Sequence, residues 1–135
     1  MVQIKILLVE DDHFLSTILA NRLKKEGYSI QQAFDGQEAI DLLKAEKPDV
    51  IVLDLILPRK SGFEVLESIS TDPQVSQIPV IILSNLGQES DIQKAKSLGA
   101  VEYRVKLQTS IENSLETIKS IVSKFLPTTQ PLEQK

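Results

Sequence analysis

Five polar side chains in this sequence stand at the ends of four apolar segments. They are Glu10, Asp11, Asp54, Ser84 and Lys106. Three carboxylates gathered at one place would raise one another's pKa unless a cation relieved their repulsion. A hard divalent ion with oxygen ligands is suited to that role, and Mg2+ is favoured because it tolerates several waters. Magnesium beside a carboxylate, with a lysine and a hydroxyl opposite, is an arrangement that handles phosphoryl groups.

The position of Asp54 carries most of this interpretation. It interrupts the apolar segment VIVLDLILP, residues 50–58, which is predicted to be a strand buried on both faces. A carboxylate inside such a strand costs several kcal/mol unless it is paired, ligated or placed at the strand's end. We therefore predict that Asp54 lies at the carboxyl end of the strand. The alternative is a carboxylate that only caps the following loop.

Five predicted strands alternate with five predicted helices along the chain. The strands are expected at 4–9, 28–34, 50–58, 80–84 and 100–105, and the helices at 13–26, 37–46, 63–70, 88–98 and 110–126. Asp12 is placed to cap the first helix and Gly27 to end it. Alternating strands and helices predict an α/β fold, a parallel sheet covered by helices on both faces. Ligands of such sheets bind at the carboxyl ends of the strands, where the five polar side chains are expected to meet.

Each of these residues also has a simpler interpretation when it is taken alone. The acidic run of residues 10–12 is typical of a helix start. Ser84 taken alone is an ordinary hydroxyl at a strand end, and Lys106 taken alone is a solvated surface lysine. His13, the one histidine, is predicted to be a surface residue at a helix start rather than a ligand or a base. The functional interpretation rests on the convergence of separate strand ends.

Composition narrows the class of protein. The 135 residues carry a net charge of −4, which argues against nucleic acid or an anionic membrane as the main partner. The absence of cysteine excludes disulfides and zinc–sulfur sites. No apolar segment approaches the roughly 20 residues of a membrane span, and the first residues lack the pattern of a signal peptide, so a cytoplasmic location is expected. Residues 1–126 are predicted to form one domain, followed by a flexible tail at 127–135.

Four segments resemble the receiver domain of two-component response regulators. They are ILLVEDD, DVIVLDLILPRKSGFEVL, PVIILS and GAVEYRVK, and the resemblance extends over about residues 4–125. It implies a flavodoxin-like, doubly wound sheet of five parallel strands in the order 2-1-3-4-5, with five helices. It also implies that Asp54 accepts a phosphoryl group from a histidine kinase or a histidine phosphotransfer protein.

The resemblance assigns a metal site to the acidic residues. Asp11 and Asp54 would bind Mg2+ directly, and the backbone carbonyl of Ile56 would be a third ligand. Glu10 would act through a water molecule.

The resemblance also assigns a switch, and two residues depart from the family pattern. Ser84 would bond the phosphoryl group, Lys106 would pair with it, and Tyr103 would turn inward together with Ser84. Family members usually have a small residue where this chain has Asn85, which is expected to crowd the phosphoryl site. They usually have proline where this chain has Leu107.

The second departure affects the Lys106–Leu107 peptide bond. In family members with proline at the second position the bond is characteristically cis, and that geometry helps to aim the lysine. A cis bond costs about 0.5–1 kcal/mol before proline but roughly 2.5–4 kcal/mol before leucine. We predict a trans bond here, with Lys106 less firmly aimed and phosphorylation slower. On sequence grounds, Leu107→Pro is expected to speed phosphorylation.

These observations predict a stand-alone receiver similar to the chemotaxis regulators, because the sequence ends shortly after the fifth helix. The resemblance implies that its output surface, as in the family, would be the helix at 88–98, the strand at 100–105 and the helix at 110–126. We expect a downstream protein target, no direct contact with nucleic acid, no membrane insertion, and a monomer or a phosphorylation-dependent dimer. Enzymatic activity is expected to be limited to intrinsic autophosphorylation and autodephosphorylation.

Two alternatives belong to other classes. A phosphatase with an aspartyl nucleophile would need a second aspartate two residues after Asp54, where this chain has Ile56. A degenerate receiver that acts as a constitutive protein–protein adaptor is kept open by Asn85 and Leu107.

Overall fold

Five strands form one parallel sheet in the order β2-β1-β3-β4-β5. They are β1 (Lys5–Val9), β2 (Ser29–Ala33), β3 (Val50–Leu53), β4 (Val80–Ser84) and β5 (Glu102–Val105). The structure is a computed structural model that describes residues 3–126, so the predicted flexible tail at 127–135 lies outside the described residues. The flavodoxin-like strand order predicted from the sequence is confirmed.

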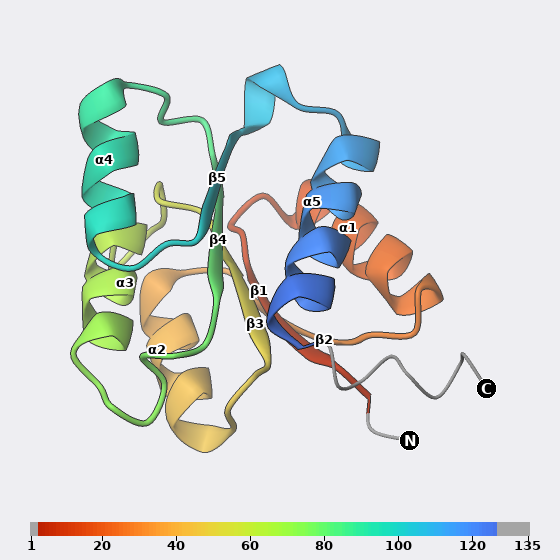
Figure 1. Ribbon diagram of the computed structural model, residues 1–135, viewed down its shortest axis with the longest axis horizontal. Helices are drawn as coiled ribbons and strands as arrows, with labels where there is room; N and C mark the ends of the chain where they lie inside the picture. Colours follow the sequence, from red (N-terminus) through yellow and green to blue (C-terminus); the bar gives the residue numbers. More distant parts are fainter. Residues whose placement is uncertain (1–2, 127–135) are drawn as a thin grey trace.

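Five helices cover the two faces of the sheet. They are α1 (His13–Lys25), α2 (Gly36–Ala45), α3 (Gly62–Ser70), α4 (Glu89–Ser97) and α5 (Ile111–Phe125), and a short 3-10 turn (Lys106–Gln108) follows β5. Figure 1 shows α1 and α5 together on one face, with α2, α3 and α4 on the other. Among residues 3–126, no helix combines the length and the apolar character that a membrane crossing requires.

The sheet divides the apolar core into two clusters. Along β1, Leu7 and Val9 pack into the cluster beneath α2, α3 and α4, whereas Ile6 and Leu8 pack into the cluster beneath α1 and α5. Successive side chains of a strand point to opposite faces, so a strand that is covered on both sides needs apolar residues at every position. This requirement explains why the central strands are uninterrupted apolar segments.

Local signals set the ends of α1 as predicted, and a signal that was not predicted begins α3. The carboxylate of Asp12 accepts hydrogen bonds from the N–H groups of Phe14 and Leu15, at 3.0 and 3.2 Å, and so caps α1. Gly27 follows the end of that helix with a φ of +98°, a conformation that glycine adopts without steric cost. The first turn of α3 is held by a capping box between Ser61 and Glu64.

The strand predicted at residues 50–58 is shorter in the structure. β3 ends at Leu53, and its pairing with β1 and β4 ends there too. Asp54 turns the chain because its side chain accepts the N–H of Ile56, at 3.1 Å. Leu55 remains buried while Ile56 is half exposed. The apolar residues after Asp54 therefore belong to a packed loop, and the predicted place of Asp54 at the strand's carboxyl end is confirmed.

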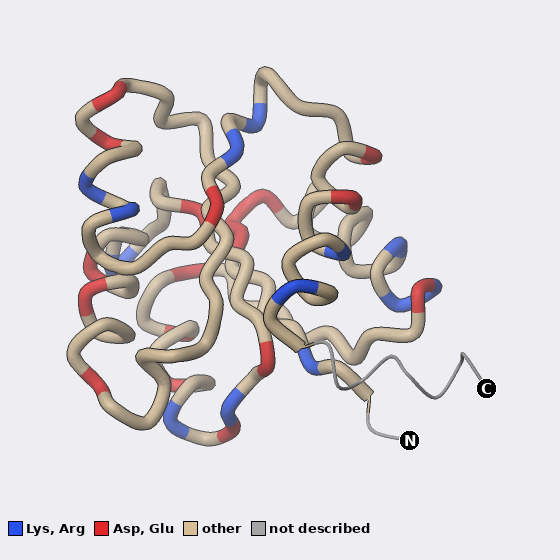
Figure 2. The backbone as a smooth tube through the Cα atoms, in the orientation of Figure 1, with Lys and Arg blue, Asp and Glu red and all other residues tan. Residues whose placement is uncertain are grey.

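The two outer strands of the sheet are short and polar. β2 carries the exposed Gln31, which fits its predicted place at an edge. β5 carries Glu102 and Arg104, whose side chains form an ion pair of 2.6 Å. Figure 2 shows acidic and basic residues interspersed over both helical layers.

Candidate functional site

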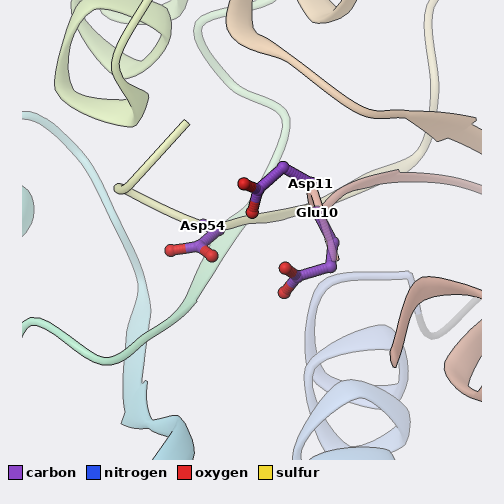
Figure 3. Close-up of side chains that lie close together, drawn as sticks. All are labelled: Glu10, Asp11 and Asp54. Carbon is purple, nitrogen blue, oxygen red and sulfur yellow. The ribbon is translucent and has the colours of Figure 1, made fainter. Parts of the chain in front are cut away.

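Two neighbouring strands deliver the three acidic residues to one place. Glu10 and Asp11 follow the last residue of β1, and Asp54 follows the last residue of β3. Those last residues, Val9 and Leu53, are paired in register. Oxygen atoms of the three carboxylates lie within 4.8 Å of one another, and Figure 3 shows the side chains converging. The predicted acidic cluster is therefore present.

Lys106 neutralises part of this cluster from the end of β5. Its Nζ lies 2.8 Å from Oδ2 of Asp54 and 2.9 Å from Oε1 of Glu10. The relative exposure of the side chains is 2% for Glu10, 3% for Asp54 and 16% for Lys106, whereas Asp11 is exposed. Charges buried to this degree persist only when they are paired and hydrogen-bonded. The ammonium group is thus the counter-charge of the two buried carboxylates.

Burial acts against the charged forms of both Glu10 and Lys106. Burial raises the pKa of Glu10, and the hydrogen bonds from Lys106 and from the N–H of Asp12 counteract that rise only in part. Burial lowers the pKa of Lys106, but the hydrogen bonds and charges of Asp54 and Glu10 outweigh it, so the net shift is upward. Lys106 is therefore a cation at neutral pH.

The donor set of the cluster fits a hard divalent cation. Glu10, Asp11 and Asp54 offer carboxylate oxygens only, which are the ligands that Mg2+ prefers in proteins. The buried pair carries two negative charges against the one positive charge of Lys106, and Asp11 adds a third negative charge on the exposed side. The net charge of the cluster is therefore negative, as a cation site requires.

Ser84 and Tyr103 both contact the loop that follows β4. Ser84 is fully buried, and its hydroxyl accepts the N–H of Leu86 at 3.3 Å. Tyr103 is 8% exposed, and its hydroxyl donates to the carbonyl oxygen of Leu86 at 2.5 Å. Tyr103 is therefore buried in this structure, while its predicted inward turn together with Ser84 stays a prediction. One loop residue joins the hydroxyl at the end of β4 to the aromatic side chain of β5.

The Lys106–Leu107 peptide bond is trans, as predicted. Despite the trans bond, Nζ of Lys106 lies within 2.9 Å of both carboxylates. The lysine therefore reaches the site, and the expectation that it is less firmly aimed stays a prediction. The sequence prediction missed a contact of this turn: Oδ1 of Asn85 accepts the N–H of Leu107 at 3.0 Å. That hydrogen bond holds the turn after β5 against the loop after β4.

Two other contacts near the cluster were not predicted. His13 is exposed at the start of α1, as expected, but its ring stacks on Phe34 at a centroid distance of 3.9 Å. Gly62 begins α3 against the backbone of Asp54. A Cβ atom at Gly62 would lie 2.2 Å from the carbonyl oxygen of Asp54 and 2.4 Å from Cα of Leu55. Only glycine allows α3 to approach the loop of Asp54 this closely.

Comparison with known proteins gives one consistent result. A family model described as the response regulator receiver domain matches residues 6–118. PdtaR, a transcriptional regulatory protein of Mycobacterium tuberculosis, is 33% identical over 122 residues, which are 90% of this chain and 58% of that protein. The chain spans between 39% and 58% of the length of the first curated relatives it matches.

Solved structures agree with this result. RcpA, a phosphorylated cyanobacterial phytochrome response regulator, is 32% identical with a TM-score of 0.81, over 94% of this chain and 96% of that chain. The Mn2+-bound form of the response regulator Rcp1 is 30% identical with a TM-score of 0.77, over 88% of this chain and 91% of that chain.

Proposed function

Because the chain belongs to the response regulator receiver domain family, we propose that it is a switch that accepts a phosphoryl group on Asp54. The observation that carries this proposal is the placement of Lys106 Nζ, 2.8 Å from Asp54, beside three clustered carboxylates. A buried carboxylate next to an ammonium group can take up a phosphoryl group, whose charge that ammonium then stabilises.

The transfer step follows from the chemistry of the carboxylate. An oxygen of Asp54 attacks the phosphorus atom of a phosphohistidine in a donor protein, either a histidine kinase or a histidine phosphotransfer protein. A P–O bond forms as the P–N bond breaks, and the departing imidazole keeps the electron pair and takes a proton from water. Lys106 exchanges its contact with the carboxylate for one with a phosphoryl oxygen, and the hydroxyl of Ser84 donates to another.

The acidic cluster would hold Mg2+ for this step. As the family resemblance implies, Asp11 and Asp54 would be direct ligands together with the carbonyl of Ile56, and Glu10 would act through water. When bound, the ion neutralises phosphoryl oxygens as charge moves onto Asp54.

Ser84 and Tyr103 would transmit the phosphorylation of Asp54 to the surface that a partner protein binds. A hydroxyl that turns toward the phosphoryl group gives up its contact with the N–H of Leu86, the residue whose carbonyl accepts from Tyr103. Within α4 only Ala95 is buried, so this helix is held by few apolar contacts and shifts at low cost. Phosphorylation would bias an equilibrium between two arrangements of α4, β5 and α5, which a downstream protein reads.

Exposed apolar side chains support a protein as the phosphoryl donor. Phe14 is 76% exposed, Ile56 52% and Leu107 86%. Phe14 lies in the first turn of α1, Ile56 on the loop that follows β3 and Leu107 in the 3-10 turn that follows β5. All three positions come shortly after the carboxyl end of a strand, where the acidic cluster lies. Large apolar side chains gathered beside a reactive site favour contact with another protein. We propose no turnover of a separate substrate, and no activity beyond intrinsic autophosphorylation and autodephosphorylation.

The test is to incubate the protein with acetyl phosphate and Mg2+. The mass increase is measured by mass spectrometry, and the amount of acid-labile phosphate bound to the protein is measured separately. The parent protein should gain one phosphoryl group, and Asp54→Asn should gain none. Asp12→Asn is the matched control, because asparagine preserves the cap of α1, and it should be labelled like the parent. Undiminished labelling of Asp54→Asn, or labelling in excess EDTA, would refute the proposal. A parent that takes up no phosphate would favour the constitutive adaptor instead.

A further inference from the structure

A single hydrogen bond joins the two loops that carry Ser84 and Lys106. Asn85 directly follows Ser84, Leu107 directly follows Lys106, and Oδ1 of Asn85 accepts the N–H of Leu107 at 3.0 Å. The register of β4 and β5 ends at the pair Ser84–Val105. The Asn85–Leu107 hydrogen bond therefore extends the contact between these two strands beyond the last residues of their ladder.

The need for such a bond follows from the place of β5. This strand lies at the edge of the sheet and pairs with β4 alone. Lys106 begins a 3-10 turn that has no side-chain cap. Its side chain nevertheless lies within 2.9 Å of two carboxylates, those of Glu10 and Asp54, which follow β1 and β3. A lysine has four rotatable carbon–carbon bonds, so the position of its backbone decides how often the ammonium group occupies the site.

We propose that Asn85 is a positioning residue that fixes the turn at Lys106 through the N–H of Leu107. The proposal rests on phosphoryl acceptance by Asp54 as its premise. A proline at position 107 would lack the N–H group, so the two residues that depart from the family pattern act as a pair. The sequence-based expectation that Leu107→Pro alone speeds phosphorylation is replaced by one in which position 85 decides the outcome.

The two roles considered for Asn85 predict opposite changes in the saturating rate of phosphorylation of Asn85→Ala. If Asn85 positions the turn, its removal should lower the saturating rate of phosphorylation about two- to tenfold, the range that corresponds to one hydrogen bond. If Asn85 instead crowds the phosphoryl site, its removal should raise that rate. Acetyl phosphate is the appropriate donor, because a small molecule reports the site without the docking of a protein.

The experiment compares the parent with Asn85→Ala and with Gln88→Ala, which removes an exposed carboxamide from the same loop. We expect Asn85→Ala to lower the saturating rate while leaving the half-saturating concentration of acetyl phosphate and the affinity for Mg2+ unchanged. Gln88→Ala should match the parent. Hydrogen exchange of the Leu107 amide, followed by NMR, should accelerate in Asn85→Ala and not in Gln88→Ala.

A second comparison isolates the hydrogen bond. The effect of Leu107→Pro is measured in the parent and again in Asn85→Ala, so that the effect of the proline ring cancels. The ratio of the saturating rate with Leu107→Pro to the rate without it should be about two- to tenfold lower in the parent than in Asn85→Ala. The reason is that only the parent has the Asn85–Leu107 hydrogen bond to lose.

Three results would overturn the inference: an unchanged or faster rate in Asn85→Ala, an equal loss in Gln88→Ala, or the same effect of Leu107→Pro in both backgrounds. These failures differ from a failure of the proposed function. In each of these three results the parent is still phosphorylated, and only the role of Asn85 is wrong. A parent that takes up no phosphate would instead remove both the proposed function and the inference that rests on it.

Discussion

Replacing Lys106 with methionine would remove the counter-charge of two buried carboxylates and preserve most of the side chain's length. Glu10 and Asp54 would keep their burial, because the backbone of β1 and β3 places them. The variant would therefore leave two negative charges side by side with little access to solvent. We expect a large loss of stability in the absence of divalent cations.

The magnitude can be worked from the contacts. At 2.8 Å and an effective dielectric constant of about 20, each contact of the ammonium has a gross Coulomb attraction of roughly 6 kcal/mol. Desolvation of the ammonium group offsets much of that attraction. Removing one partner of such a buried group costs about 3–5 kcal/mol in comparable cases. Typical domains have an unfolding free energy of about 5–15 kcal/mol, so the variant should approach the limit of folding.

The loss of stability in Lys106→Met should become smaller as the pH falls. Burial already raises the pKa of Glu10, and the variant removes the opposing hydrogen bond of Lys106, so this pKa should rise further. The native state would then hold a proton that the unfolded state releases above the ordinary pKa of glutamate, 4.5. The free energy of unfolding of the variant should increase as the pH falls from neutrality through the raised pKa. The upward pKa shift of Lys106 in the parent contributes stability that is fully present below the ordinary lysine pKa of 10.5 and is lost only as the pH rises above that value. It therefore adds no pH dependence between neutral and mildly acidic pH.

Urea unfolding in EDTA at neutral and mildly acidic pH, repeated with Mg2+, provides the assay. The deficit of Lys106→Met should shrink at the lower pH, and Mg2+ should stabilise the variant more than the parent, because the ion replaces the missing charge. A loss below about 1 kcal/mol at neutral pH, the level of an exposed ion pair, would refute the interpretation of Lys106 as a buried counter-charge. An equal gain from Mg2+ in both proteins would do the same.

Two further predictions concern the metal site and the approach of α3. Calorimetric titration with Mg2+ should show a weaker affinity for Asp11→Ala than for Glu10→Ala, since a direct ligand loses a bond to the ion and an outer carboxylate loses a water-bridged contact; equal affinities would contradict the assignment. Gly62→Ala should lower the free energy of unfolding by about 1–3 kcal/mol or more, because its Cβ would meet the backbone of Asp54 at 2.2 Å. Gly87→Ala, whose Cβ would meet Val105 at an ordinary 3.5 Å, is its control, and equal urea midpoints for the two variants would argue against the close approach.

The place where the acidic residues and Lys106 meet could be predicted from the sequence, because it follows from the topology of a parallel sheet. In a parallel sheet the carboxyl ends of the strands share one edge, so residues that follow separate strands must meet there. Asp54 could be placed on energetic grounds alone, since a charge inside a buried strand is costly. The alternation of elements was enough to predict a parallel sheet, whereas the exact strand order came from the resemblance to a known family.

The details that the sequence did not predict depend on contacts between distant loops. The end of β3 at Leu53 follows from a hydrogen bond between Asp54 and the N–H of Ile56, and an apolar pattern does not report it. The bond between Asn85 and Leu107 joins residues 22 positions apart, and each of the two looked like a defect when it was considered alone. The predicted place of Lys106 beside Asp54 agrees with the structure, whereas the Asn85–Leu107 contact next to it was not predicted.

The position of β5 at the edge of the sheet has a consequence for solubility. An edge strand presents unpaired N–H and C=O groups that can template pairing with another chain. β5 is only four residues long and carries an ion pair between Glu102 and Arg104, both of which discourage strand addition. The length and the charged side chains of β5 therefore work against aggregation at this edge of the sheet.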